Sequence, residues 1–419
     1  MDDLLSGALS RLDEAARYID VDQEVLEKLR YPKETLSVRL SVRMDDGSSR
    51  SFPAWRCRYD DTRGPTKGGI RFHPNSSMEE VATLAFWMTF KCAVMNLPYG
   101  GGKGAVKVDV HDLSKSELER LSRAYVHAFA GMIGPDRDIP APDVYTNSMI
   151  MGWMADEYSS IVRQPSPAVI TGKPLALGGS LGRDDATARG GYYLIKHLET
   201  DLGLDKTQKR VVIQGYGNAG FHIARLLHAD GYRIIGVSDS RGAIVCEDGL
   251  DPHAVQAVKA QKGSVTAYAN GRARMVSDNE MLALDCDLLV PAALEDQIHE
   301  GNAGSIKAKV VLELANGPVT PKADLLLQGN GITVLPDILA NAGGVTVSYF
   351  EWVQNRQGYY WHLEEIHERL RTIMETEGRR VWDIHTAKAT PMRTAAYVHA
   401  LERLSNAIAA HGTQSFFAG

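Results

Sequence analysis

The feature that most limits how this chain can fold is a glycine-rich turn in its second half. A short apolar run, residues 211–213, leads into the sequence GYGNAG, and an apolar helical stretch follows as far as Leu227. Gly215 would permit a tight turn, Gly217 would let a pyrophosphate reach the backbone, and Gly220 would let the helix lie close to the sheet. The pattern therefore predicts a dinucleotide site at a helix N-terminus. A tight βα turn without a ligand is the simpler alternative.

A carboxylate follows the next expected strand at the position where such sites bind ribose. Asp239 comes about 20 residues after the turn, and there it would accept hydrogen bonds from the adenosine ribose of NAD. Its charge would repel the 2′-phosphate of NADP, whereas Ser240 and Arg241 beside it are able to accommodate one. The cofactor is therefore NAD or NADP.

The chain changes character near the glycine-rich segment 172–191, which we interpret as a hinge. Beyond it, short apolar strands alternate with helical or loop segments, as in a parallel doubly wound sheet. We expect an α/β protein with a Rossmann-type dinucleotide-binding domain over residues 184–389. An N-terminal α/β domain over residues 1–183, joined by a C-terminal helix over 390–419, would bind substrate and form the oligomer.

Local patterns give the expected elements outside the nucleotide domain. A helix is expected over residues 2–30, then an antiparallel hairpin whose first strand spans 36–42, since apolar and polar residues alternate there. Further elements are expected at four places: a helix opened by Ser77 and running to Ala93, a strand over 105–110, a helix over 114–133, and closing helices over 363–382 and 390–411.

Composition excludes several classes of function. The 419 residues carry a net charge of −6, which provides no basic face for nucleic acid. The N-terminus is acidic, and no apolar run approaches the roughly 18 residues of a membrane span. The four cysteines are far apart, as reduced thiols of a cytoplasmic protein would be. The 13 histidines show no metal-binding spacing, so no metal is expected.

Three lysines stand in unusual surroundings. Lys67 and Lys103 lie among glycines, in GPTKGGIRF and PYGGGKGAV, and Lys91 lies in the apolar helical stretch FWMTFKCAV. A lysine is rarely buried unless it is paired. A flexible loop would explain Lys103, and a side chain that reaches the surface would explain Lys91. A ligand site would explain all three.

Asp143, in DIPAPDVYTN, is the fourth residue of interest. It ends a proline-flanked loop, and a helix cap is the ordinary interpretation of such an aspartate. Asp136 and Asp138, close by, are better interpreted as loop or ion-pairing residues.

Together these motifs resemble the glutamate/leucine/phenylalanine/valine dehydrogenase family, and within it the hexameric glutamate dehydrogenases. The resemblance extends over nearly the whole chain, in the order GPTKGGIRFHP, TFKCAV, LPYGGGKG, IPAPDVYTN, GGSLGR, GYGNAG, SDSRGAI, ELANGP, PDILANAGGV and VSYFEW. These motifs are long, ordered and specific.

The resemblance implies a role for each site residue. Lys103 and Asp143 match the catalytic lysine and aspartate, and Lys91 matches the lysine that holds the substrate α-carboxylate. Lys67, helped by Ser348, matches the lysine that holds the side-chain carboxylate of glutamate. Met88 occupies a position that varies within the family and would line the substrate pocket.

The resemblance also extends to the cofactor. Thr187 and Asn218 match residues that contact the dinucleotide, and Asn316 and Asn341 fall where its nicotinamide half would lie. Ala188 departs from the family, which usually has glycine there, so the backbone geometry at that position is in question.

The implied activity is NAD(P)-dependent oxidative deamination of L-glutamate to 2-oxoglutarate and ammonia, and the reverse, by a homohexamer. We expect burial and the neighbouring charges of Lys67 and Lys91 to lower the pKa of Lys103 from about 10.4 toward roughly 7–8, so that it can act as a base. The glycines around it would admit substrate and cofactor. The alternatives are a dehydrogenase for leucine, valine or phenylalanine, and a non-catalytic regulatory paralogue.

Overall fold

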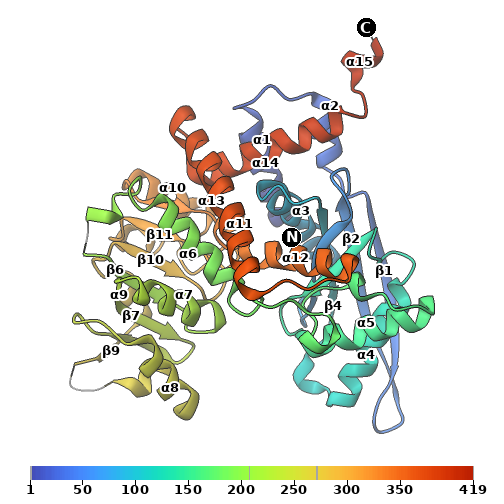
Figure 1. The fold of residues 1–419 in the computed structure, drawn as a ribbon, viewed down its shortest axis with the longest axis horizontal. Coiled ribbons are helices and arrows are strands. Elements are labelled where there is room, and N and C mark those ends of the chain that lie inside the picture. The colour runs from blue at the N-terminus through green and yellow to red at the C-terminus, as the bar shows by residue number, and fades with distance from the viewer. Residues whose placement is uncertain (1, 207, 270–271, 419) are drawn as a thin grey trace. The chain divides into compact units, whose positions relative to one another are not determined.

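The computed structural model describes residues 2–206, 208–269 and 272–418, and within them the chain forms two compact α/β units (Figure 1). The first unit comprises Met1–Arg183, Val345–His367 and Tyr397–Gly419, and the second comprises Asp184–Gly344 and Glu368–Ala396. The division after Arg183 falls inside the glycine-rich segment 172–191.

The first unit is built on a five-stranded sheet in the order β1-β2-β4-β3-β5. Its strands are β1 (Glu34–Arg43), β2 (Ser49–Asp60), β3 (Thr66–Phe72), β4 (Gly100–Val106) and β5 (Asp138–Pro142). The first two form the expected antiparallel hairpin, whereas β4, β3 and β5 run parallel to one another. Parallel pairing brings the same ends of three strands together at one edge of the sheet.

The helices of the first unit are α1 (Asp2–Ala16), α2 (Gln23–Leu29), α3 (Met78–Val94), α4 (Lys115–Phe129), α5 (Ser148–Val162) and α15 (Gln414–Ala418). Of these, α3, α4 and α5 pack against the sheet. The Ser77 side chain caps α3, and Ser114 with Glu117 forms a capping box on α4. The apolar residues of the sheet, α4 and α5 form one core.

Two expectations for the first unit were wrong in their bounds. The helix expected over residues 2–30 is two helices, because Asp22 caps a new helix by accepting a hydrogen bond from the Glu24 N–H. The strand expected over 105–110 is β4, which already begins at Gly100 and includes all the glycines of the motif.

The second unit is built on a seven-stranded sheet in the order β12-β11-β10-β6-β7-β8-β9. Its strands are β6 (Arg210–Gln214), β7 (Arg233–Asp239), β8 (Gly242–Val245), β9 (Arg274–Val276), β10 (Leu288–Pro291), β11 (Val310–Leu312) and β12 (Thr333–Leu335). The five strands from β12 to β7 are parallel, as the alternating sequence pattern indicated. The strands β8 and β9 add an antiparallel edge, which the sequence pattern did not indicate.

Helices of the second unit include the one that follows the GYGNAG turn. They are α6 (Ala186–Leu198), α7 (Asn218–Ala229), α8 (Pro252–Lys262), α9 (Asp278–Leu282), α10 (Pro321–Gly329) and α11 (Asp337–Ala340). Three further helices carry residues of both units: α12 (Gly343–Gln357), α13 (Leu363–Lys388) and α14 (Met392–Ala409). The closing helices expected from the sequence are α13 and α14, and α13 runs on to Lys388.

None of the helices within the described residues combines the length and apolar character that a membrane crossing requires. In the same part of the chain, no three His, Cys, Asp or Glu side chains are grouped so as to hold a metal ion.

Candidate active site

Lys103 and Asp143 meet in the first unit. Lys103 lies in the middle of β4 and Asp143 directly follows β5, and the two strands flank β3. The Lys103 Nζ is 2.9 Å from the Asp143 Oδ1, and only 7% of the lysine side chain is exposed. Lys103 is therefore a buried, paired lysine and not the solvated charge of a flexible loop.

The glycines around Lys103 are required by protein packing. A Cβ on Gly104 would lie 2.2 Å from the Tyr125 hydroxyl, and one on Gly101 would lie 2.3 Å from the Ala85 carbonyl oxygen of α3. These contacts leave no room for a side chain. The expectation that the glycines serve to admit substrate and cofactor was therefore wrong for these two positions, where they let helix and strand approach one another.

Asp143 is held as an ionised carboxylate by two cations. Its Oδ2 accepts a hydrogen bond of 2.9 Å from the Arg71 Nε, while Lys103 occupies Oδ1. Burial raises the pKa of Asp143, but the charges of Lys103 and Arg71 outweigh it and hold that pKa well below its ordinary value. Asp143 is not a helix cap, since Asn147 caps α5.

Lys67 is a lysine whose proton affinity is strongly reduced by burial. It lies on β3 with 1% of its surface exposed, and its Nζ is 3.4 Å from the Pro140 carbonyl oxygen. Burial, and next the charge of Arg56, lower the pKa of Lys67 from 10.5 to about 7. We expected Lys103 to be crowded by cations in this way. That was wrong, because its nearest charged partner is a carboxylate.

The other expected substrate residues lie on two helices of the same unit. Met88 and Lys91 are three residues apart on α3, hence on one face, and both are half-buried. Lys91 therefore does not extend fully into solvent. Burial raises the pKa of the Cys92 thiol to about 12, against the opposing charges of Lys67 and Lys91, so both lysines act on this one thiol. Ser348 lies buried on α12.

Arg56 and Asp138 form a fully buried ion pair. Nothing in the sequence indicated that Arg56 takes part in it. The Arg56 Nε and Nη2 donate to the two oxygens of Asp138 at 2.7 and 2.6 Å. Arg56 also donates to the Gly68 carbonyl oxygen, next to Lys67. The interpretation of Asp138 as an ion-pairing residue is confirmed, and Asp136, likewise, pairs with Arg356.

In the second unit the GYGNAG turn has the geometry that its glycines indicated. Gly215 has a φ of +91°, and a Cβ on Gly220 would lie 1.8 Å from the Gly215 carbonyl oxygen. Gly217 caps α7, and a Cβ there would meet no atom within 4 Å. The helix N-terminus, which begins with Asn218, is therefore open on the side where a phosphate would approach.

Asp239 is already engaged by protein donors. Its Oδ1 accepts from the Arg241 N–H and the Ser264 hydroxyl, both at 3.0 Å, and its Oδ2 accepts from the Val265 N–H at 2.8 Å. These bonds lower the pKa of Asp239 against the effect of burial. Ser240 is exposed in the turn that follows β7.

The two asparagines expected near the nicotinamide are in contact. The Asn341 Nδ2 donates to the Asn316 Oδ1 at 3.0 Å and to the Ala315 carbonyl oxygen at 3.1 Å. Thr187 lies half-buried in the first turn of α6. Ala188, the departure from the family, is a buried residue of the same helix, and its φ is not positive, so alanine fits the backbone.

A buried arginine links the loops that carry these asparagines. Arg393, near the start of α14, donates to Glu313, Asp324 and Asp337 at 2.6, 2.6 and 3.3 Å. Glu313 follows β11 and Asp337 follows β12, so the network ties both strand ends to α14. Burial and the two neighbouring aspartates raise the pKa of Glu313 to about 7, although Arg393 opposes the rise.

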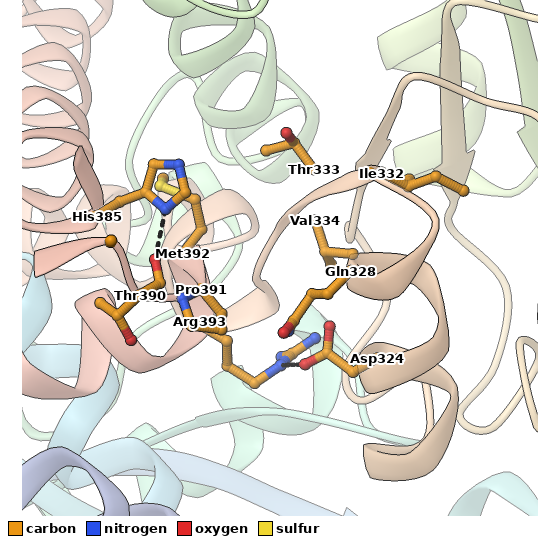
Figure 2. Close-up of a pocket in the computed structure, with 12 residues that line it drawn as sticks. Asp324, Gln328, Ile332, Thr333, Val334, His385, Thr390, Pro391, Met392 and Arg393 are labelled. Carbon is orange, nitrogen blue, oxygen red and sulfur yellow. Dashed lines mark hydrogen bonds and ion pairs between the residues drawn. The ribbon is translucent and has the colours of Figure 1, made fainter.

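A pocket of about 400 Å³ lies over this network (Figure 2). Asp324 and Arg393 meet on one side of it, and on the other the His385 ring faces the Thr390 carbonyl oxygen. None of the site residues expected from the sequence lines it.

A buried lysine–aspartate pair in one α/β unit and a glycine-rich strand–helix turn in the other are expected of a dehydrogenase that uses a pyridine nucleotide. Comparison with protein families agrees. Residues 178–412 match the glutamate/leucine/phenylalanine/valine dehydrogenase family, and residues 32–160 match its dimerisation domain. The chain belongs to this family.

Individual relatives match the chain along nearly its whole length. An NADP-specific glutamate dehydrogenase of a Synechocystis species is 50% identical over 421 residues, 99% of this chain and 98% of the relative. A cryptic catabolic NAD-specific glutamate dehydrogenase of Bacillus subtilis is 46% identical over 97% of this chain and 95% of its own. The leucine-bound hetero-hexameric glutamate dehydrogenase of Thermus thermophilus superimposes with a TM-score of 0.92 at 38% identity, covering 98% of this chain and 97% of that one.

Proposed function

We propose that the chain is an NAD(P)-dependent glutamate dehydrogenase, which converts L-glutamate to 2-oxoglutarate and ammonia and catalyses the reverse reaction. The observation that carries the proposal is the Lys103–Asp143 contact in the unit that also buries Lys67. Full-length similarity to glutamate dehydrogenases with either coenzyme preference supports it.

Lys67 provides the basis for substrate choice. A glutamate side chain brings a second carboxylate into the site, and burying it without a partner would cost several kcal/mol. A buried lysine beside Arg56 is itself stabilised in its charged form by such an anion. Lys91 would hold the α-carboxylate, Ser348 would assist Lys67, and Met88 would line the pocket between them.

Asp143 and Lys103 supply the proton transfers. Asp143, held ionised, accepts a proton from the substrate nitrogen and later returns it. The Lys103 ammonium donates to Asp143 at 2.9 Å, so the two groups are placed to pass a proton between the substrate nitrogen and the water that adds to Cα. This pairing also argues against a non-catalytic paralogue, which would have no need of it.

The second unit fits a dinucleotide, bound in Rossmann fashion at the start of α7. Gly217 leaves that helix end open, and Gly215, Asn218 and Gly220 shape the turn. When bound, the nicotinamide ring supplies the hydride acceptor for the substrate Cα. Asn316 and Asn341 would orient that half, and Thr187 would contact the dinucleotide.

Asp239 and Ser240 would meet the adenosine ribose. The donors already on Asp239 come from residues 241, 264 and 265, so a ribose hydroxyl would have to share or displace them. Because the relatives include enzymes specific for each coenzyme, we propose NAD or NADP without choosing between them.

We further propose that the first unit, expected from the sequence over residues 1–183 with 390–419, is the substrate and oligomerisation domain, and that the second unit, expected over residues 184–389, is the coenzyme domain. The structure adds residues 345–367 to the first unit and residues 390–396 to the second. We also propose that the enzyme is a homohexamer. The match to the family's dimerisation domain and the hetero-hexameric relative support a hexameric assembly. A cytoplasmic location is proposed because the four cysteines are free and buried.

Steady-state kinetics test the proposal. We expect 2-oxoglutarate and ammonia to support oxidation of NADH or NADPH, and the ratio of the two kcat/KM values assigns the coenzyme. The 2-oxo acids of leucine, valine and phenylalanine should react at least about a hundredfold more slowly, since they leave Lys67 without its anion. Faster turnover of any of them than of 2-oxoglutarate would contradict the proposal.

A further inference from the structure

Asp143 is held by more than its catalytic partner. Arg71, on β3, donates to the Asp143 Oδ2 at 2.9 Å, so that each carboxylate oxygen accepts a hydrogen bond from a different cation. Arg71 and Lys67 are four residues apart on one strand and therefore share a face of the sheet.

Glu80 binds the other end of the same guanidinium. The Arg71 Nη1 lies 2.6 Å from the Glu80 Oε1. Glu80 is in the first turn of α3, where its N–H donates to the Ser77 hydroxyl at 3.2 Å, so the helix cap fixes the position of this carboxylate. The planar fork of arginine suits such a bridge between two carboxylates, which a lysine would not make in the same geometry.

We propose that Arg71 and Glu80 together set the proton affinity of Asp143, acting as positioning residues for the proton transfers of the dehydrogenase. The inference rests on the proposed function, in which Asp143 accepts and returns a proton. Arg71 fixes the orientation of the carboxylate, and Glu80 moderates the charge with which Arg71 holds it.

The charges explain why both residues are needed. The ionisable groups that face Asp143 are Lys103 from β4 and Arg71 from β3, with Glu80 from α3 behind Arg71. The charges of the two cations and the two carboxylates sum to zero. Without Glu80 the group would carry a net positive charge, and Asp143, already a weak base, would be a weaker one still. Without Arg71 the Asp143 Oδ2 would lose the cation that binds it at 2.9 Å.

The two residues therefore have opposite effects on Asp143. Arg71→Met removes a cation and should raise its proton affinity, whereas Glu80→Gln leaves Arg71 uncompensated and should lower it. Since Glu80 acts through Arg71, the double variant should behave like Arg71→Met alone. A purely structural role would give no such reversal of sign.

Protonation of Asp143 can be measured without turnover. A water-soluble carbodiimide with an amine nucleophile labels protonated carboxyl groups, and peptide mass spectrometry gives the labelling rate at Asp143 between pH 5 and 7. Above the pKa this rate changes about tenfold for each unit by which the pKa moves. We expect labelling about tenfold or more faster in Arg71→Met and several-fold slower in Glu80→Gln. Asp136, whose side chain is 70% exposed, is the internal control and should label equally in every variant.

Glutamate oxidation by the same proteins gives the functional readout. Both single variants should lose kcat by more than tenfold with little change in the KM for glutamate, and Arg71→Lys should restore part of the loss.

Labelling at Asp143 that moves in the same direction in both variants, or a wild-type rate in Glu80→Gln, would overturn the inference. If Arg71→Met does not fold, labelling and kinetics of Glu80→Gln and Arg71→Lys test the inference instead. Absence of glutamate turnover in the wild-type protein would instead refute the proposed function and leave the labelling result standing.

Discussion

At the scale of single residues, the account depends on what each buried charge is paired with. Lys67, Lys103 and Asp143 all lie in one unit, but only the last two neutralise each other in the structure. Lys67 has a carbonyl oxygen at 3.4 Å and the charge of Arg56 acting against it. An anionic substrate is therefore the partner that Lys67 is suited to receive.

Replacing Lys67 by leucine tests that assignment. We expect Lys67→Leu to lower kcat/KM for glutamate by at least about a hundredfold, because the substrate carboxylate would be buried without a cation. Turnover of apolar amino acids should rise relative to glutamate. A variant that retained kcat/KM for glutamate near the wild-type value would refute the role, and Lys107→Leu, at an exposed lysine, serves as the control.

Lys67 should also oppose folding, in a way that depends on pH. Its pKa falls from 10.5 to about 7 on burial, so the folded state disfavours the protonated lysine. The destabilisation is complete below about pH 7 and disappears as the pH rises toward 10.5. Lys67→Met should therefore raise the Tm at pH 6–7 and give a smaller gain near pH 10. A gain that grew with pH, in melts followed by circular dichroism, would contradict the lowered pKa.

At the scale of elements, β4 shows why a glycine-rich motif can form a buried strand. Gly101 faces the Ala85 carbonyl oxygen of α3, and Gly104 faces Tyr125 and Arg56. Each glycine marks a place where another element approaches too closely for a side chain. The strand can hold Lys103 in place because its neighbours are packed this tightly.

Gly104→Ala should therefore disturb the site although it removes no functional group. The new Cβ would lie 2.2 Å from the Tyr125 hydroxyl, so the strand or the ring must move. We expect a lower Tm and at least a tenfold loss of kcat. Gly131→Ala is the matched control, because a Cβ there meets no atom within 4 Å. Equal behaviour of the two variants would show that β4 tolerates the shift.

The sequence predicted elements well where the signal is local. The GYGNAG turn, the hairpin and the helix starts at Ser77 and Ser114 depend on neighbouring residues, and the structure confirms them. Position relative to distant residues was predicted less well. Arg71 was overlooked although its period-two spacing from Lys67 put both on one face. Its two partners lie on α3 and after β5, and only the parallel pairing of β3 with β5 brings the second of them near.

The same limit explains the error about Lys103. Three lysines in glycine-rich or apolar surroundings indicated mutual repulsion, since sequence alone shows like residue types and not their partners. The resemblance to a family assigned Lys103 and Asp143 catalytic roles, but their pairing was not expected. Arg56–Asp138 and the Arg393 network had no local signal, because each joins residues far apart in the chain.

At the scale of the whole molecule, a buried arginine joins several elements in each unit: Arg56 in the first and Arg393 in the second. In the second unit Arg393 ties α14 to the ends of β11 and β12, just before Asn316 and Asn341. The Glu313 Oε2 in turn accepts from the Asp337 N–H at 2.8 Å, and Asp337 accepts from the Gly317 N–H at 2.9 Å. The network is therefore suited to fix the loops proposed to orient the nicotinamide.

Arg393→Met should weaken both stability and coenzyme binding. Three buried carboxylates would lose their cation, at a cost of about 3–5 kcal/mol in the free energy of unfolding. We expect the KM for the coenzyme to rise more than the KM for glutamate, which the first unit is proposed to bind. Urea unfolding and kinetics measure the two effects, with Arg393→Lys as the variant that retains the charge. Unchanged stability would mean that the carboxylates do not depend on Arg393.

The most direct test of the central claim is the rate of glutamate oxidation by Asp143→Asn. The claim is that Asp143, paired with Lys103, is the proton acceptor of a glutamate dehydrogenase. Asparagine keeps the size of the side chain but cannot hold the proton, so kcat should fall by about a thousandfold or more, while glutamate and coenzyme still bind, as measured by calorimetry. A kcat within a few-fold of wild type would contradict the account.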